Sequence, residues 1–281
     1  MKCVEKAYAK VNLTLAVGEK RLDGYHEVVS VMQRVSLCDT LTAERTDSGI
    51  SLACSDPSLP SGEENLAHRA ASLFFRETGI AGGAALTLEK RIPSQAGLGG
   101  GSSDAASALL ALRKLYAPAL PDGALETMAA ALGSDVPFFI RGGTQLATGR
   151  GEVLSPLPPL TDGWFVIVKP AESFSTPSMY RRLDEPGSVL VRNSRYMQDA
   201  VAANNVHAVA VELHNSFERV VPKDSSLRTI KDALRAQGAL ASLLSGSGSA
   251  VFGLFDTETA ARAAVEALRP AWPEIFLARP V

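Results

Sequence analysis

The segment IPSQAGLGGGSSDAAS, residues 92–107, combines residue types that could bind phosphate. Four of the five residues from Gly97 to Gly101 are glycine, and Ser102 and Ser103 follow directly. Glycine loses more conformational entropy on folding than any other residue, so such a cluster marks a backbone that bends sharply or lies very close to another group. The helical pattern that follows, residues 102–116, presents unpaired N–H groups and the positive end of its dipole at its start. A glycine-rich loop leading into a helix is therefore suited to bind phosphate, and hydroxyl groups at that position could reach a magnesium ion.

A surface loop capped by serine is the alternative explanation for this segment, because Ser102, Ser103 and Asp104 are all good residues for a helix start. The preceding residues 85–93 alternate between apolar and polar side chains, as a half-buried strand does. The predicted order is thus strand, glycine loop, helix, which favours the phosphate-binding interpretation. The loop has neither the Gly-Lys-Ser/Thr ending of a Walker A motif nor the Gly-x-Gly-x-x-Gly spacing of dinucleotide-binding proteins, so it belongs to another type of phosphate loop.

Two further segments carry polar side chains that could act on a substrate. In AYAKVNLTL, Lys10 and Asn12 lie on the same face of a predicted strand, and a solvated polar face is the ordinary explanation. In LGSDVPFFIRGG, Asp135 stands between a predicted helix end at Gly133 and Pro137, where a capping or turn aspartate is usual. The functional alternative is a carboxylate held in a loop, where it can accept a proton from a substrate hydroxyl.

Two predicted turns have a functional interpretation as well as a structural one. RLDGYHEV contains an Asp-Gly turn typical of a hairpin, and Tyr25 and His26 beside it could stack on and hydrogen-bond a flat heterocycle. The segment LLSGSGSAVFG, residues 243–253, is either a tight hairpin or a second close approach of backbone, to the first glycine loop or to a ligand. The other histidines, His68, His207 and His214, fall in helical patterns and are expected to be structural.

The remaining pattern predicts a mixed α+β chain. A proline-rich segment at residues 154–163 is a candidate boundary, which gives an N-terminal domain of residues 1–158 and a C-terminal domain of residues 159–281. Residues 184–195 are expected to be exposed. Strands are predicted at 7–17, 28–37, 40–45, 50–53, 84–90, 164–170, 239–244, 250–256 and 275–278, and helices at 65–79, 122–133, 205–220, 225–237 and 258–268.

Composition limits the class of protein. The 281 residues are 46% hydrophobic and 21% charged with a net charge of -2, which suits a globular chain and gives no electrostatic footprint for nucleic acid or an anionic membrane. A membrane-spanning helix needs about 18 consecutive apolar residues, and no stretch of the sequence is that long. The N-terminus also lacks a signal-peptide pattern, so we expect a cytoplasmic protein. Cys3, Cys38 and Cys54 are widely spaced and odd in number, and are expected to be reduced, mostly buried thiols.

The motifs IPSQAGLGGGSSDAASAL, AKVNLTL and LLSGSGSAVFG together resemble the three motifs of the GHMP kinase superfamily, over about residues 6–253. This resemblance implies an N-terminal domain like ribosomal protein S5 domain 2 and a C-terminal split ferredoxin-like domain, with the active site in the cleft between them. It also implies ATP as phosphate donor, accompanied by Mg²⁺.

Within the superfamily, AKVNLTL with DGYHEV, NLAHRAA and LGSDVPFFIRGG are similar to the kinases that phosphorylate the 2-hydroxyl of a cytidine-diphosphate-linked methylerythritol. The similarity implies that Asp135 is the catalytic base and that Lys10 orients and polarises the attacking hydroxyl. The implied substrate-binding residues are Asn12, Tyr25, His26, Phe174 and Thr176. The implied ATP-binding residues are Asn65, Pro93, Gln95, Gly97, Leu98, Gly99, Gly100, Gly101, Ser102 and Ser103, with Ser102 also as metal ligand.

Two alternatives remain at this point. A GHMP kinase for homoserine or a mevalonate derivative would not need Tyr25 and His26 to read a nucleobase. A non-catalytic, ligand-sensing relative would be expected to lose Lys10 or Asp135, and this chain has both. The expected partners are small molecules only, with neither nucleic acid nor membrane, and the protein is expected to be a monomer or a weak homodimer.

Overall fold

A computed structural model describes residues 1–184 and 194–281. The chain forms two compact units, each made of non-contiguous segments. Unit 1 contains Met1–Ala9, Cys38–Ser94 and Gly99–Gly142, and unit 2 contains Lys10–Leu37, Gln95–Leu98 and Gly143–Val281. The segments alternate because the long strands β1 (Lys2–Lys20) and β2 (His26–Thr46) each contribute residues to both units. The boundary predicted after residue 158 divides the chain differently and stays a prediction.

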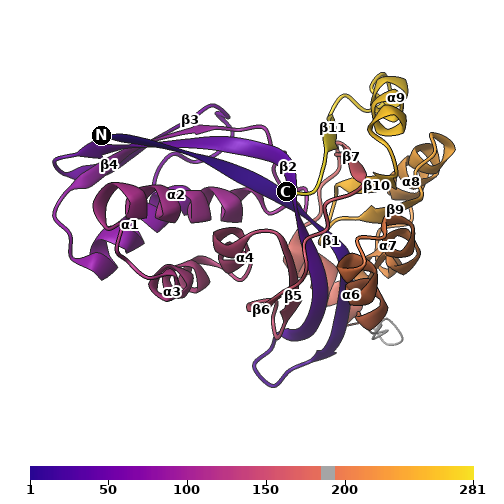
Figure 1. Ribbon diagram of the computed structural model, residues 1–281, viewed down its shortest axis with the longest axis horizontal. Coiled ribbons are helices and arrows are strands. Elements are labelled where there is room, and N and C mark those ends of the chain that lie inside the picture. Colours follow the sequence, from indigo (N-terminus) through magenta and orange to yellow (C-terminus); the bar gives the residue numbers. More distant parts are fainter. Residues whose placement is uncertain (185–193) are drawn as a thin grey trace. The chain divides into compact units, whose positions relative to one another are not determined.

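Unit 1 is a sheet with helices along one face (Figure 1). Strand β4 lies between β3, to which it is parallel, and the second half of β2, to which it is antiparallel. Helix α1 connects β3 to β4, as a crossover between parallel strands requires, and packs against α2. The elements of this unit, besides its parts of β1 and β2, are β3 (Gly49–Cys54), α1 (Leu66–Thr78), β4 (Gly83–Glu89), α2 (Gly100–Tyr116), α3 (Asp122–Leu132) and α4 (Val136–Arg141).

The ends of two helices in unit 1 test the sequence interpretation directly. Helix α1 begins where it was predicted, because the Asn65 side chain accepts a hydrogen bond from the Ala67 N–H, and it ends at Gly79 with a left-handed φ of 64°. The prediction for α2 was wrong by two residues. Gly99, with φ of 73°, precedes the first helical residue, Gly100, and no side chain caps this end.

Unit 2 contains a four-stranded antiparallel sheet in the order β11, β7, β10, β9. Helix α8 packs against β9 and β10, and α9 packs against β7, β10 and β11. The aromatic rings of Phe165 and Phe252 meet edge to face within this sheet, with centroids 5.6 Å apart. The bounds of these elements are β7 (Trp164–Val168), α8 (Leu227–Ala236), β9 (Ala241–Leu244), β10 (Val251–Phe255), α9 (Glu258–Leu268) and β11 (Ile275–Ala278).

The rest of unit 2 includes the first half of β2 and the second half of β1. There β2 pairs with β5, which pairs with β6, and β1 runs parallel to β8. The bounds are β5 (Thr144–Thr148), β6 (Val153–Pro156), α5 (Thr176–Leu183), α6 (Arg195–Ala202), α7 (Val206–Glu212), β8 (His214–Asn215) and the 3₁₀ turn η1 (Ser216–Arg219).

The α+β fold class is confirmed, but several local expectations were wrong. The helix predicted at 205–220 ends at Glu212, because Leu213 is extended and the Asn215 side chain instead caps η1. Helices α4, α5 and α6 were not predicted. Most of the stretch 184–195, expected to be exposed, lies outside the described residues. The three thiols are free but only half-buried, at Cys3, Cys38 and Cys54. In the part of the chain that the structure describes, no helix is long and apolar enough to span a membrane.

Candidate active site

The glycine loop folds against the second glycine-rich turn. Gln95 and Gly97 have positive φ of 52° and 72°, and the Ala250 N–H donates to the Ala96 carbonyl at 3.1 Å. The Ser245 hydroxyl donates to the Gly97 carbonyl at 3.0 Å. A Cβ atom on Gly97 would lie only 2.0 Å from the Ser245 carbonyl oxygen. Both alternatives for residues 243–253 are therefore found: the segment joins the antiparallel strands β9 and β10, and it also lies against the first glycine loop. Glycine is required at residue 97 because no side chain fits at this contact.

The second half of the loop enters helix α2. Gly99 turns the chain with a left-handed φ, and the Ser103 N–H donates to the Gly99 carbonyl at 2.9 Å. The N–H groups of residues 100–102 belong to the first helical turn, for which a helix offers no internal acceptors. Ser102 in the same turn is half-buried. This geometry suits an anionic phosphate group at the helix start.

Lys10 and Asn12 are buried in unit 2, with 4% and 3% of their surfaces exposed, so the solvated polar face was the wrong alternative. The Lys10 Nζ donates to the Asn12 Oδ1 at 2.5 Å, and the Asn12 Nδ2 donates to the Ser30 Oγ at 2.8 Å. The Lys10 backbone N–H also donates to the Leu98 carbonyl at 3.0 Å. Since a buried ammonium group needs polar partners, this network fixes Lys10 beside the glycine loop.

Asp135 lies in unit 1, in the short connection between α3 and α4. It occupies the residue before α4, as the capping interpretation predicted, but its side chain makes no capping hydrogen bond to that helix. Pro137 lies in the first turn of α4, and Gly133 ends α3. The half-buried carboxylate of Asp135 therefore lies in the short connection between two helices and does not cap α4.

The structure separates Tyr25 from His26, although they are adjacent at the β1–β2 hairpin. His26 is 6% exposed and stacks on Tyr180 with ring centroids 5.2 Å apart. Its Nδ1 donates to the Gly18 carbonyl at 3.0 Å, and its Nε2 lies 3.0 Å from an Asp184 carboxylate oxygen. Tyr25 is 55% exposed. Only the tyrosine therefore presents a ring to solvent.

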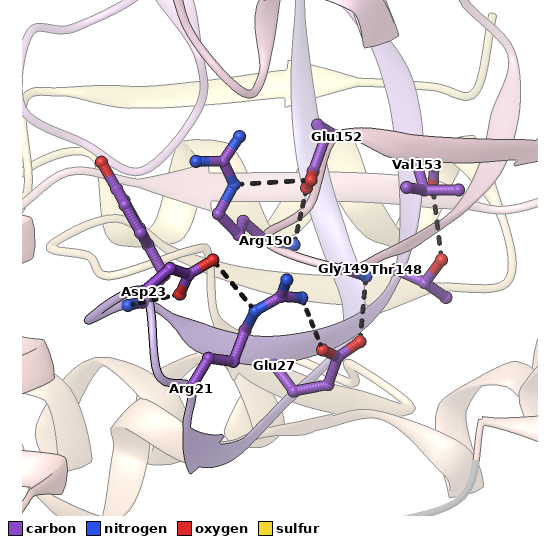
Figure 2. A network of polar contacts seen from close by, with 9 residues as sticks. Arg21, Asp23, Glu27, Thr148, Gly149, Arg150, Glu152 and Val153 are labelled. Carbon is purple, nitrogen blue, oxygen red and sulfur yellow. Dashed lines mark hydrogen bonds and ion pairs between the residues drawn. The ribbon is translucent and has the colours of Figure 1, made fainter.

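A polar network joins the β1–β2 hairpin to the β5–β6 turn (Figure 2). Arg21 pairs with Glu27 at 3.0 Å, and the second oxygen of Glu27 accepts from the Gly149 N–H at 3.1 Å. The guanidinium carbon of Arg150 lies 4.8 Å from the centre of the Tyr25 ring. This cation covers one face of the ring, and the Tyr25 side chain stays largely exposed.

Other predicted contact residues have structural partners. Phe174 packs at Gly248, where an added Cβ would lie 2.7 Å from its ring, and the hydroxyl groups of Thr176 and Ser247 are 2.7 Å apart. Both predicted residues therefore lie against the second glycine-rich turn. In unit 1, Asn65 uses its amide to cap α1 and to donate to a loop carbonyl at 2.9 Å, so a nucleotide contact through this side chain would compete with the cap.

Sequence reasoning missed a buried charged cluster of Asp39, Lys90 and Asp104 in unit 1. The Lys90 Nζ lies 2.5 Å from an oxygen of Asp39 and 2.7 Å from an oxygen of Asp104. Burial lowers the pKa of Lys90, but the charges of Asp104 and Asp39 outweigh burial, so this pKa is raised. Burial raises the pKa of Asp104 to about 7, and Lys90 opposes the shift. The only signal in the sequence was a lysine at the strand end before the glycine loop.

The cluster predicts a pH-dependent stability. Because the Asp104 pKa is about 7 in the folded protein and ordinarily 3.8, the folded state binds this proton more tightly. Its contribution to the free energy of unfolding is fully present below about pH 4 and is lost as pH rises through 7. From pH 5 to pH 8, the wild type should lose up to about 3 kcal/mol that Asp104→Asn does not lose. Denaturant unfolding of both proteins at the two pH values measures this difference, and equal losses would contradict it.

A magnesium ion was also expected here. Among the described residues, no group of three His, Cys, Asp or Glu side chains could hold a metal ion. Mg²⁺ commonly keeps several waters and takes further oxygen ligands from phosphates, so one hydroxyl at the helix start, such as that of Ser102, fits an ion that arrives with a nucleotide.

Comparison with protein families identifies two matching models. Residues 65–143 match the GHMP kinases N terminal domain, and residues 197–274 match the GHMP kinases C terminal model. A protein of Clostridium botulinum (strain Eklund 17B / Type B) is 37% identical over 277 residues, covering 98% of this chain and 99% of its own. One of Moorella thermoacetica is 42% identical over 278 residues, covering 97% of each. Both are named 4-diphosphocytidyl-2-C-methyl-D-erythritol kinase.

Solved structures give the same result. A crystal structure of 4-(cytidine 5'-diphospho)-2C-methyl-D-erythritol kinase aligns with a TM-score of 0.86 and 40% identity, covering 99% of each chain. A homoserine kinase from Cytophaga hutchinsonii aligns with a TM-score of 0.75 over 99% of this chain and 92% of its own, but at 18% identity, so that likeness shows a shared fold. The first similarity extends to sequence over the whole length, and the second does not.

Proposed function

Since the chain belongs to the GHMP kinase family, and within it to the 4-diphosphocytidyl-2-C-methyl-D-erythritol kinases, we propose that it transfers the γ-phosphate of ATP to the 2-hydroxyl of 4-diphosphocytidyl-2-C-methyl-D-erythritol. This is a step of the non-mevalonate route to isoprenoid precursors. The observation that carries the proposal is about 40% identity over nearly the full length to relatives with this name. The homoserine and mevalonate kinases resemble this chain at under 20% identity, which favours the first function over the alternative.

We propose Asp135 as the base that accepts the proton of the 2-hydroxyl, and Lys10 as the group that orients and polarises that hydroxyl. Phosphoryl transfer needs little covalent help from protein, so positioning and charge neutralisation supply most of the rate. The buried network of Lys10 and Asn12 supports this role, because it holds the ammonium group rigidly next to the backbone of Leu98. These assignments come from the family motifs.

ATP is the donor that a kinase of this family uses, and we propose that residues 95–103 bind its phosphates. The positive φ angles of Gly97 and Gly99 and the open first turn of α2 support this proposal. Asn65 and Pro93 would lie at the nucleoside part. When bound, Mg²⁺ would neutralise phosphate charge, and Ser102 is the residue we propose to contact it.

We propose that Tyr25 stacks on the cytosine ring, with Asn12, His26, Phe174 and Thr176 as further substrate contacts. The exposed face of Tyr25 and the guanidinium on its other face support the stacking role. The His26 Nδ1 already donates to the Gly18 carbonyl, so a contact to cytosine would be made by Nε2, which lies 3.0 Å from an Asp184 oxygen but forms no hydrogen bond with a described residue.

Replacing Tyr25 by alanine should raise the KM of the cytidine substrate about tenfold, because stacking of one base on an aromatic ring is worth about 1–3 kcal/mol. The KM of ATP should stay within about twofold, since the loss is confined to the acceptor side. Steady-state kinetics with each substrate varied in turn measures the two values. Tyr25→Phe keeps the ring and is the matched control. Equal KM values for the acceptor in the alanine variant and the wild type would exclude stacking by Tyr25.

A coupled ADP-release assay tests the function itself. Purified protein with Mg-ATP is given 4-diphosphocytidyl-2-C-methyl-D-erythritol, methylerythritol phosphate without the nucleotide, homoserine or mevalonate. Turnover with the first compound alone is expected. ATP binding without turnover of any of the four would favour the ligand-sensing alternative.

We further propose that the enzyme works in the cytoplasm as a monomer or weak homodimer, without nucleic-acid or membrane partners. The near-neutral net charge of -2 supports this, because it offers no electrostatic attraction to an anionic polymer or surface.

A further inference from the structure

The cluster of Asp39, Lys90 and Asp104 brackets the glycine loop. Lys90 ends the segment before the loop and Asp104 follows it, with only residues 91–103 between them. One Lys90 ammonium group binds both Asp39 at 2.5 Å and Asp104 at 2.7 Å. The entrance and the exit of the loop are thus tied to each other through a single side chain.

Asp39 also fixes the backbone at the entrance of the loop. Its second oxygen accepts hydrogen bonds from the N–H groups of Arg91 at 2.5 Å and Ile92 at 2.8 Å. At the exit, Gly100 lies over the same cluster, because a Cβ there would be 3.1 Å from the Ile92 side chain and 3.4 Å from the Lys90 Nζ. Strand β2, the segment before the loop and the start of α2 therefore meet at one set of directional bonds.

A contribution to folding stability does not by itself explain why these three charged side chains are buried together. The exposed fractions of the Asp39, Lys90 and Asp104 side chains are 0%, 8% and 4%, so three ionisable groups have left water. Buried ion pairs commonly contribute no more stability than apolar side chains of the same volume. Among the described residues, the Asp104 Oδ1 has no hydrogen-bond partner, which is a further cost. Unlike an apolar core, the cluster forms directional hydrogen bonds, and these fix the positions of the loop entrance and the start of α2.

We infer that Asp39, Lys90 and Asp104 are positioning residues for nucleotide binding, which hold the first turn of α2 and the loop entrance in their phosphate-binding arrangement before ATP arrives. The inference rests on the proposed function, because it assigns the loop to ATP. Preorganisation of this kind raises affinity by removing the cost of ordering the loop upon binding. None of the three side chains needs to touch the nucleotide.

Nucleotide affinity of Asp104→Leu tests the inference. Leucine has a similar shape but cannot bond Lys90, and it should raise the Kd of ATP about tenfold, or about 1.4 kcal/mol. Asp104→Asn can still accept a hydrogen bond from Lys90 and should restore the Kd to within about threefold of the wild type. Calorimetric titration with Mg-ATP in the absence of acceptor measures each Kd.

Leu112→Ala is the matched control. Leu112 is fully buried in the same helix, two turns after Asp104, so its truncation lowers stability without touching the loop. Its Kd for ATP should equal that of the wild type. If Asp104→Leu weakens ATP binding no more than Leu112→Ala does, the cluster is merely structural and the inference is overturned.

A second variant covers the case in which Asp104→Leu fails to fold. Asp39→Asn keeps an oxygen for the Arg91 and Ile92 N–H groups but presents an amide nitrogen to Lys90, so it breaks the bridge alone. It should raise the Kd of ATP about fivefold, and an unchanged Kd would overturn the inference. Wild-type protein that binds no ATP would refute the proposed function instead, so the two failures are distinguishable.

Discussion

Asp135→Asn should lower kcat by about 10²–10⁴-fold, the range that removal of a general base produces. Asparagine has the same shape as aspartate but cannot accept the proton of the attacking hydroxyl at neutral pH. The KM values and the Kd of ATP should stay within about threefold, because the carboxylate acts on the proton in the transition state and does not bind the donor. Steady-state kinetics and calorimetric titration with ATP measure the two quantities separately.

The structure explains why this variant should remain folded. The Asp135 side chain makes no capping hydrogen bond to α4, so the amide removes no cap. Asp122→Asn is a suitable control, since Asp122 is an exposed aspartate in the first turn of the neighbouring helix α3 and pairs with Arg113. It should leave kcat unchanged. Turnover by Asp135→Asn at the rate of this control would remove Asp135 from the mechanism.

Local sequence signals predicted the local features of the site. The Asn65 cap, the terminal Gly79 and the order of strand, glycine loop and helix all follow from residues close together in the chain. The approach of the second glycine-rich turn was one of the alternatives left open beside a tight hairpin, because small residues on both segments permit backbones to come close. The start of α2 was placed too late, since Gly99 can adopt the left-handed φ of 73° that turns the chain into a helix without a side-chain cap.

Burial of polar groups could not be predicted in the same way. Alternation in a strand places Lys10 and Asn12 on one face but does not show what covers that face. Ser30, the partner that Asn12 finds, lies 18 residues away. The bond between Lys90 and Asp39 spans 51 residues, and nothing in a single sequence pairs them. Tyr25 and His26 are neighbours in the chain, yet the histidine turns inward to partners distant in sequence, among them the stacked ring of Tyr180 on α5.

Gly97→Ala should have the largest effect on the fold of the site. A Cβ at residue 97 would lie 2.0 Å from the Ser245 carbonyl oxygen and 2.9 Å from its carbonyl carbon, both of them backbone atoms that cannot rotate away. The φ of 72° is also unfavourable for any side chain. Backbone strain and overpacking each cost about 1–3 kcal/mol, so the free energy of unfolding should fall by about 3–5 kcal/mol. The Kd of ATP should rise at least about tenfold, because the loop must move to relieve the clash. Denaturant unfolding and calorimetric titration measure the two losses.

Gly101→Ala separates this steric effect from a general intolerance of the loop. Gly101 lies in the first turn of α2. A Cβ added there would lie 3.6 Å from the Leu66 side chain, which is an ordinary van der Waals distance. Alanine is favoured over glycine in a helix by about 0.5–1 kcal/mol, so this variant should be as stable as the wild type or slightly more stable. Two alanines four residues apart thus have opposite expected effects on unfolding. If Gly97→Ala unfolds at the same denaturant concentration as Gly101→Ala, the packing of the glycine loop against Ser245 does not hold in solution.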